Sequence, residues 1–207
     1  LRALGSSEDT TRRVAAQMLG LSEQQVAPHL LATFQDGPPP LRQAAAYALG
    51  KRGDQAAVAP LRRALRDPDS GVRFSALWAL ADLKAVEALI EALSVPDGDL
   101  RAAAAFRLGD MEDLRAVEPL IKALRDPEPS VRNSAADALG ALGDARAVAA
   151  LAECLQDRDV SVRRSAARSL GLIGDEAAIE PLQARLQVET EATVSREIRD
   201  ALKELGQ

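Results

Sequence analysis

The stretch DPEPSVRNSAADALGALGDARAVAAL, residues 126–151, decides the fold. If Val131 is position 0, apolar residues recur at positions 4, 8 and 11, which lie on one face of a helix. Gly143 suits the left-handed conformation that ends this helix, and Asp144 suits the cap of the next one. The proline of the initial Asp-Pro breaks the preceding helix. The stretch therefore predicts two short helices, which are too small to bury their apolar faces alone.

The stretch recurs along the chain with starting points 28 to 32 residues apart. We name the segment typified by AVEPLIKALRD helix A and the one typified by VRNSAADALGALG helix B. Helix B recurs at residues 11–20, 41–50, 72–81, 100–109, 131–140 and 162–171, and in degenerate form at 194–203. Repeats of this kind bury their core by stacking on neighbours. We predict an all-α solenoid, an alpha-alpha superhelix of about six and a half two-helix repeats of about 31 residues, forming a single domain over residues 1–207.

The recurring motif D-P-x-x-x-V-R-x-x-A-A-x-A-L-G-x-L-G-D-x-x-A-V-x-P-L resembles the HEAT-repeat superfamily, in its short form known as PBS-lyase HEAT-like repeats. It is also similar to the consensus of artificial alpha-repeat binder libraries. The resemblance covers Leu1 to about Gly206. It implies that the B helices line a concave surface. Because the chain begins LRALGSSED rather than with Met, we expect it to be a fragment of a longer protein.

The composition and charge of the chain argue against several classes of function. The 207 residues carry a net charge of −5, so no global positive field attracts nucleic acid or an anionic membrane. A single cysteine excludes a disulfide framework within the chain. No apolar run is long enough for a membrane span and no signal peptide is visible, so we expect a cytoplasmic protein.

An Asp and an Arg recur six positions apart around the turn between helices A and B. In HEAT families such residues resemble a ladder that ties this turn to helix B. The structural ladder expected here comprises Asp36, Arg42, Asp67, Arg73, Asp126, Arg132, Asp157 and Arg163. Val95 replaces the Asp in the third full repeat, and Ser195 replaces the last Arg. The segment QVETEA, residues 187–192, also lacks the Asp expected before Ser195.

Positions 2 and 6 of helix B point almost opposite to its apolar face and should face solvent. Four of the five aromatic residues lie at these positions: Tyr47, Phe74, Trp78 and Phe106. The fifth, Phe34, replaces a recurring leucine of helix A and is predicted to lie in the core. Exposed aromatic clusters tend to mark interaction sites. We therefore predict a non-catalytic scaffold that binds a protein or peptide on the concave helix-B face.

Charged residues flank the predicted aromatic stripe. The middle of the groove is expected to be acidic, with Asp82, Asp110 and Asp137. Its C-terminal end is expected to be basic, with Arg164 and Arg168. The third repeat lacks three residues between helices B and A, which should change the local curvature beside Trp78. Two other uses of the rings stay open: packing within the parent protein, and self-association.

Catalysis finds little support in the sequence. His29 is alone and is read as a surface or helix-terminal residue, and Cys154 as a buried small residue. Motifs for metal, phosphate or nucleophile chemistry are missing, so we expect no cofactor and no metal. Deoxyhypusine hydroxylases of HEAT-like fold bind iron through His-Glu pairs, which this chain lacks. The resemblance also leaves two alternatives: an E/F-type phycobilin lyase-like or bilin-protein-associated subunit, and a nucleic-acid-binding HEAT-like module, the latter disfavoured by the acidic groove.

Overall fold

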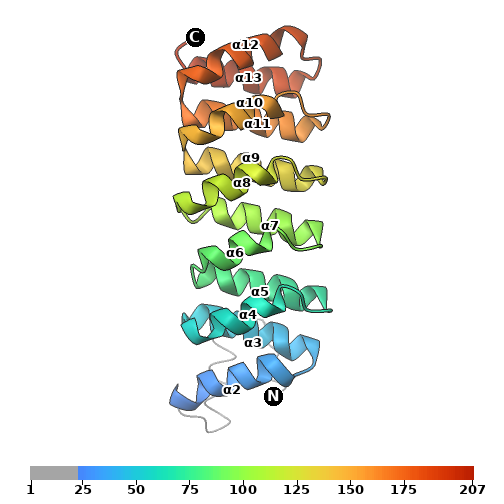
Figure 1. Ribbon diagram of the computed structural model, residues 1–207, viewed down its shortest axis with the longest axis vertical. Helices are drawn as coiled ribbons and strands as arrows, with labels where there is room; N and C mark the ends of the chain where they lie inside the picture. Colours follow the sequence, from blue (N-terminus) through green and yellow to red (C-terminus); the bar gives the residue numbers. More distant parts are fainter. Residues whose placement is uncertain (1–22) are drawn as a thin grey trace. The chain divides into compact units, whose positions relative to one another are not determined.

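The computed structural model describes residues 23–207, and the first B-helix block, residues 11–20, lies outside this range (Figure 1). The described part contains α-helices and short 3-10 turns and no strand. The fold class predicted from the repeats is confirmed. The chain divides into two compact units, Leu1–Val95 and Pro96–Gln207. The division falls at Val95, where the repeat pattern loses its Asp.

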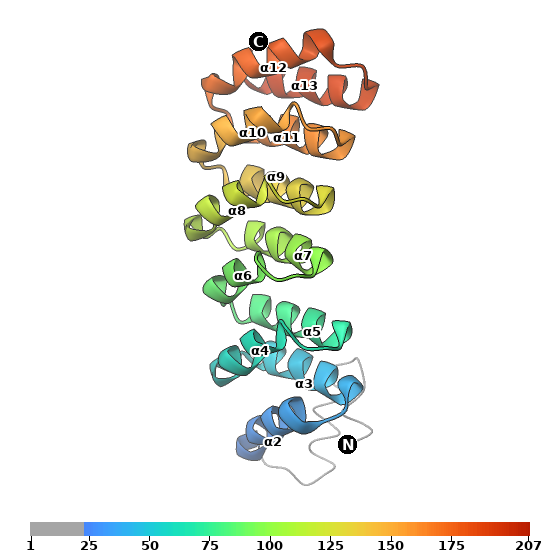
Figure 2. The same ribbon diagram turned by 45° about the vertical axis from the view of Figure 1, so that its right-hand side comes forward.

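The described part of the first unit, residues 23–95, contains two B helices and three A helices. The A helices are α2 (Glu23–Asp36), α4 (Val58–Ala64) and α6 (Val86–Ala92), and the B helices are α3 (Pro39–Arg52) and α5 (Ser70–Asp82). Helix α3 packs along α5, while α2 covers α3 and both α4 and α6 contact α5. The B helices thus form one layer of this unit and the A helices the other (Figure 2).

The second unit repeats this arrangement with four B helices and three A helices. The B helices are α7 (Gly98–Gly109), α9 (Pro129–Leu142), α11 (Val160–Ile173) and α13 (Ala192–Glu204). The A helices are α8 (Val117–Ala123), α10 (Val148–Cys154) and α12 (Ile179–Val188). Each B helix packs on the next, and each A helix packs on the B helix that follows it.

Helix ends follow the predicted punctuation. Gly53, Gly143 and Gly174 end their B helices with positive φ of 71°, 65° and 73°. The aspartate after each glycine accepts a hydrogen bond from the backbone N–H two residues on, which starts a 3-10 turn before helix A. Such a turn is missing before α6, where Lys84 takes a φ of 54° instead. The three residues that the third repeat lacks are therefore those of this turn. The effect of their absence on the local curvature stays a prediction.

Alanine and leucine fill the interface between the two layers, as the helical phase predicts. In α9, Val131, Ala135 and Leu139 are fully buried, and the equivalent residues of α5 and α11 are buried as well. Phe34 is only 4% exposed, so its assignment to the core is confirmed. Because the side chains at positions 0, 4 and 8 of helix B are buried, those at positions 2 and 6 lie on its outer surface.

The recurring glycine of helix B allows neighbouring B helices to approach closely. A Cβ atom built on Gly109 would lie 2.8 Å from Cα of Ala138, and one on Gly50 would lie 2.7 Å from Cα of Ala79. These contacts involve backbone atoms, which cannot move aside as the end of a flexible side chain can. The glycine is therefore required by packing between repeats.

Gly109→Ala is expected to lower the free energy of unfolding by about 1–2 kcal/mol, because overpacking costs more than the gain in helix propensity. Gly98→Ala in the same helix is the matched control, since its Cβ would meet the flexible side chain of Glu128 at 3.0 Å. Urea unfolding followed by circular dichroism measures both. Equal stabilities of the two variants would show that the contact between α7 and α9 is looser than described.

Candidate functional site

Three aromatic side chains lie on neighbouring B helices of the first unit. Tyr47 comes from α3, and Phe74 and Trp78 come from α5, which packs along α3. None of the three belongs to the buried core, and each is partly exposed. Lys51 Nζ lies 5.6 Å from the centroid of the Tyr47 ring, within the range of a cation–π contact. These three residues form what we call the unit-1 aromatic cluster.

Phe106 lies at the same helical position in α7, in the second unit. Its side chain is 53% exposed, the most open of the described aromatic residues. The sequence predicts that Phe106 lies in one stripe with Tyr47 and Trp78. Because the two units are described separately, this continuity stays a prediction.

The acidic residues predicted for the groove each have a basic neighbour. Asp82 lies 3.1 Å from Lys51 Nζ, and Asp110 lies 3.4 Å from a guanidinium nitrogen of Arg107. Asp137 lies 2.5 Å from Arg168, one of the arginines expected at the basic end, while Arg164 is exposed on α11. The separation into an acidic middle and a basic end is therefore weaker than the sequence suggests.

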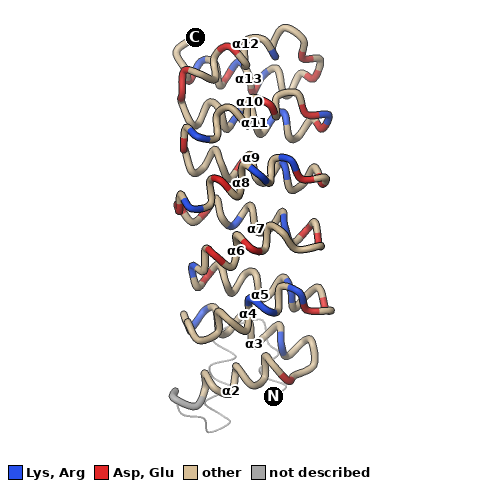
Figure 3. Tube along the Cα trace, viewed as in Figure 1, with Lys and Arg blue, Asp and Glu red and all other residues tan. Residues whose placement is uncertain are grey.

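The ladder residues form two kinds of contact at the turns between helices A and B, where Figure 3 shows acidic and basic residues side by side in each unit. Arg132 donates from NH1 to the backbone oxygens of Asp126 and Pro127, which ties its own turn to helix B. Its Nε and NH2 donate to the carboxylate of Asp157 in the next repeat, at 2.7 and 2.8 Å. Arg132 thus joins two repeats.

The other ladder arginines make different sets of contacts. Arg101 binds Asp126 through Nε and NH2, both at 2.8 Å, whereas Arg42 reaches Asp67 through NH2 alone, at 2.7 Å. Arg73 donates to the backbone oxygens of Asp67 and Pro68. Asp36 is exposed.

Two ladder residues escaped the sequence analysis. Arg101 was not assigned because its repeat carries Val95 in place of the upstream Asp. Glu189 accepts from Nε and NH2 of Arg163 at 2.9 and 3.1 Å and also from Arg185. It ends a longer helix A one position later than the Asp of other repeats, so a search for Asp at fixed spacing missed it.

Three ladder carboxylates, those of Asp126, Asp157 and Glu189, are held in their ionised forms. Burial alone would raise the pKa of Asp126 and Asp157, but hydrogen bonds from Arg101 and Arg132 outweigh it and lower both pKa values. For Glu189 the same balance, with donation from Arg163 and Arg185, lowers the pKa to about 2. The ion pairs of these three carboxylates therefore persist into the acidic range.

The lone thiol lies on the inner face of helix α10. Cys154 is 7% exposed, which confirms the prediction of a buried small residue, and burial raises the pKa of its thiol to about 11. His29, on α2, is partly exposed. Within residues 23–207, no group of three or more His, Cys, Asp or Glu side chains is placed to hold a metal ion.

Cys154 is expected to react with a disulfide reagent at pH 8 at least about a hundredfold more slowly in the native chain than in urea, because the reactive thiolate is scarce and shielded. The rate of chromophore release measures this. A native rate close to that in urea would contradict the burial of α10 against α11.

Helices in the described part of the chain fall short of the length and apolar character that a bilayer span needs.

Comparison with known proteins decides the family. The sequence profile of HEAT repeats matches residues 27–89, 86–167 and 144–203. The chain belongs to the HEAT-repeat family. No curated protein sequence matches it. Its HEAT repeats are nonetheless similar in fold to several solved structures, all at low sequence identity.

YibA of Escherichia coli aligns with a TM-score of 0.64 at 20% identity, covering 99% of this chain and 79% of YibA. An engineered protein gives a TM-score of 0.61 at 24% identity, covering 87% of this chain and 96% of its own. A computationally designed armadillo repeat protein for modular peptide recognition gives 0.59 at 18% identity, covering 86% and 99%. These likenesses show the fold, an alpha solenoid scaffold.

Proposed function

We propose that this HEAT-repeat chain is a non-catalytic scaffold that binds a peptide or protein segment on its helix-B face. The observation that carries the proposal is the unit-1 aromatic cluster. Its three rings lie outside a core that alanine and leucine already fill. Large rings at polar positions of a repeat gain little for folding, whereas Trp and Tyr are the commonest anchors of binding interfaces.

The chemistry of this surface suits an extended segment with apolar side chains. Two neighbouring B helices lie about 8–10 Å apart, so rings on both can contact successive side chains of one strand. Lys51, paired with Asp82 beside Tyr47, offers polar groups at the rim. Designed armadillo repeat proteins for modular peptide recognition share the solenoid architecture, which supports this mode of binding.

A selection from a display library of random peptides tests the proposal. The native chain serves as bait, and enriched peptides are re-tested on Trp78→Ala and on Leu114→Ala, a control that removes an exposed apolar side chain far along the sequence in the second unit. We expect the dissociation constant to rise about thirtyfold or more with Trp78→Ala, since truncated anchors cost about 2 kcal/mol, and to stay unchanged with Leu114→Ala.

Peptides that bind both variants as tightly as the native chain would refute the helix-B assignment. Sedimentation of the native chain at several concentrations tests whether the rings serve self-association instead of peptide binding. Dimers that dissociate in Trp78→Ala, together with a selection that enriches nothing, would replace the peptide-binding proposal by self-association.

A further inference from the structure

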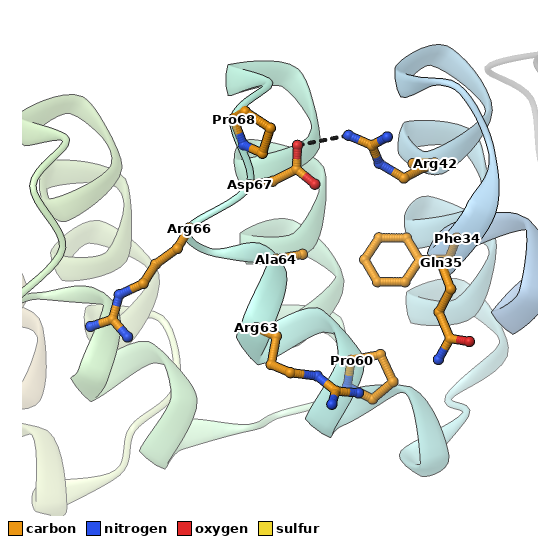
Figure 4. A pocket seen from close by; sticks show the side chains of 9 residues that line it. All are labelled: Phe34, Gln35, Arg42, Pro60, Arg63, Ala64, Arg66, Asp67 and Pro68. Carbon is orange, nitrogen blue, oxygen red and sulfur yellow. Dashed lines mark hydrogen bonds and ion pairs between the residues drawn. The ribbon is translucent and has the colours of Figure 1, made fainter.

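A hollow of about 600 Å³ opens on the helix-A side of the first unit, away from the unit-1 aromatic cluster. It lies between the end of α2, helix α4 and the turn that follows α4 (Figure 4). Gln35 and Arg63 extend beside it from α2 and α4, and the ring of Phe34 faces Ala64 across it. Its volume falls within the range of small-molecule sites.

A contact that the second unit makes between equivalent helix-A positions is not made beside the hollow. In the second unit, Arg125, in the turn after α8, donates to Glu153 of α10 at 3.0 Å. Arg125 stands one residue before its ladder acid and Glu153 four residues before the next one. In the first unit these positions hold Gln35 and Arg63, and no hydrogen bond joins them. Arg185, at the position of Arg63, donates to Gln156, at the position of Gln35, at 3.2 Å in the second unit, so the pair beside the hollow forgoes a contact that these residue types can make.

Two guanidinium groups of the hollow have no acid to pair with. Among residues 23–207, neither Arg63 nor Arg66 has an ion-pair partner, and both are exposed. Arg66 occupies the position of Arg125, but the matching acid, Glu91, is bound by Arg62. Figure 4 draws Arg66 extended away from the hollow, and no described ion pair holds it there.

A third arginine at the rim is incompletely paired. Nε of Arg42 is buried and finds no acceptor in the described part of the chain, whereas Arg132 uses both Nε and NH2. Asp67 is the one carboxylate among the lining residues, and it already accepts from Arg42 and from its own turn. Three arginines against one engaged aspartate leave an excess of positive charge.

We propose that this hollow binds a carboxylate attached to a flat apolar group. Guanidinium groups recognise carboxylates through paired, charge-assisted hydrogen bonds. Pro60, Pro68, Ala64 and the edge of Phe34 supply rigid apolar walls for the rest of the ligand. The ligand is either a free organic acid or an acidic residue next to an aromatic one in a peptide. The site uses residues of the A helices and their turns together with Arg42 at the start of α3, and no residue of the unit-1 aromatic cluster lines it.

Titration of the whole chain with benzoate, followed by two-dimensional NMR of the backbone amides, tests the site. We expect saturable shifts at residues 34–35 and 60–68, with a dissociation constant on the order of 1 mM for so small a ligand. Acetate lacks the ring and benzamide lacks the charge, so each should bind at least about fivefold more weakly. Shifts that do not saturate, or acetate binding as tightly as benzoate, would overturn the proposal.

The variant pair separates a site from general attraction by charge. Arg63→Ala/Arg66→Ala should weaken benzoate binding about tenfold. Lys122→Ala/Arg125→Ala removes the same charge from the equivalent positions of α8 and of the turn that follows it, and should leave binding within twofold. Equal weakening by the two pairs would overturn the site. The dipeptide acetyl-Phe-Asp-amide identifies the source: tighter binding than benzoate indicates a peptide, and weaker binding a free acid.

Discussion

Arg132→Ala is expected to lower the free energy of unfolding by about 3–5 kcal/mol, the usual cost of breaking a buried ion pair. The side chains of Arg132 and Asp157 are 8% and 12% exposed, so the remaining carboxylate would stay largely away from water without its partner. The backbone oxygens of Asp126 and Pro127 would lose their donor as well. Because Arg132 contacts both its own turn and the next repeat, its loss loosens two junctions at once.

Arg125→Ala is the matched control for this prediction. Arg125 also pairs with an acid of the next repeat, Glu153, but the two side chains are 77% and 66% exposed. Exposed pairs contribute about 0–1 kcal/mol. Guanidinium unfolding followed by circular dichroism compares the two variants. Similar losses would mean that the ladder contributes no more than ordinary surface ion pairs.

Glu189→Gln should produce a loss of stability that depends on pH. The native chain holds the pKa of Glu189 at about 2, compared with an ordinary value of 4.5. The folded state therefore binds a proton less readily than the unfolded chain. The stabilisation is complete above pH 4.5 and disappears as the pH falls to about 2. We expect the free energy of unfolding of the native chain to exceed that of Glu189→Gln by on the order of 3 kcal/mol at pH 7. Near pH 2 the two free energies should be almost equal.

Glu191→Gln, two residues along the chain, is the control, because Glu191 is exposed and its side chain lies outside the pair with Arg163. Urea unfolding at several pH values between 2 and 7 gives the difference from the native chain for each variant. A difference for Glu189→Gln that stays constant over this range would contradict the ion pairs with Arg163 and Arg185.

Local features of the repeat could be predicted from the sequence because they depend on neighbouring residues. The helical phase placed Val131, Ala135 and Leu139 in the core, and the buried positions of Phe34 and Cys154 followed from alignment of the repeats. The glycine and aspartate caps also depend only on residues a few positions apart.

Contacts between repeats could not be predicted in the same way. The sequence predicted a ladder that ties each turn to its own helix B, and Arg73 does bind the backbone oxygen of Asp67, but the carboxylate of Asp67 binds Arg42 of the previous repeat. This partner is set by the rise from one repeat to the next, which sequence spacing does not contain. The pairing of Asp82, Asp110 and Asp137 with nearby cations was missed as well. The hollow lies beside Gln35 and Arg63, whose equivalents are joined by hydrogen bonds in the second unit, and the sequence pattern does not show which of these pairs form.

The fluorescence of Trp78, the one tryptophan of the chain, tests the binding proposal most directly. A peptide enriched by the native chain is titrated into it and into Tyr47→Ala, with acrylamide quenching measured at each point. Peptide binding at the unit-1 aromatic cluster should shift the emission to the blue, reduce quenching, and become about tenfold or more weaker in Tyr47→Ala. A peptide that binds while the emission and quenching of Trp78 stay constant would contradict the helix-B face as the binding surface.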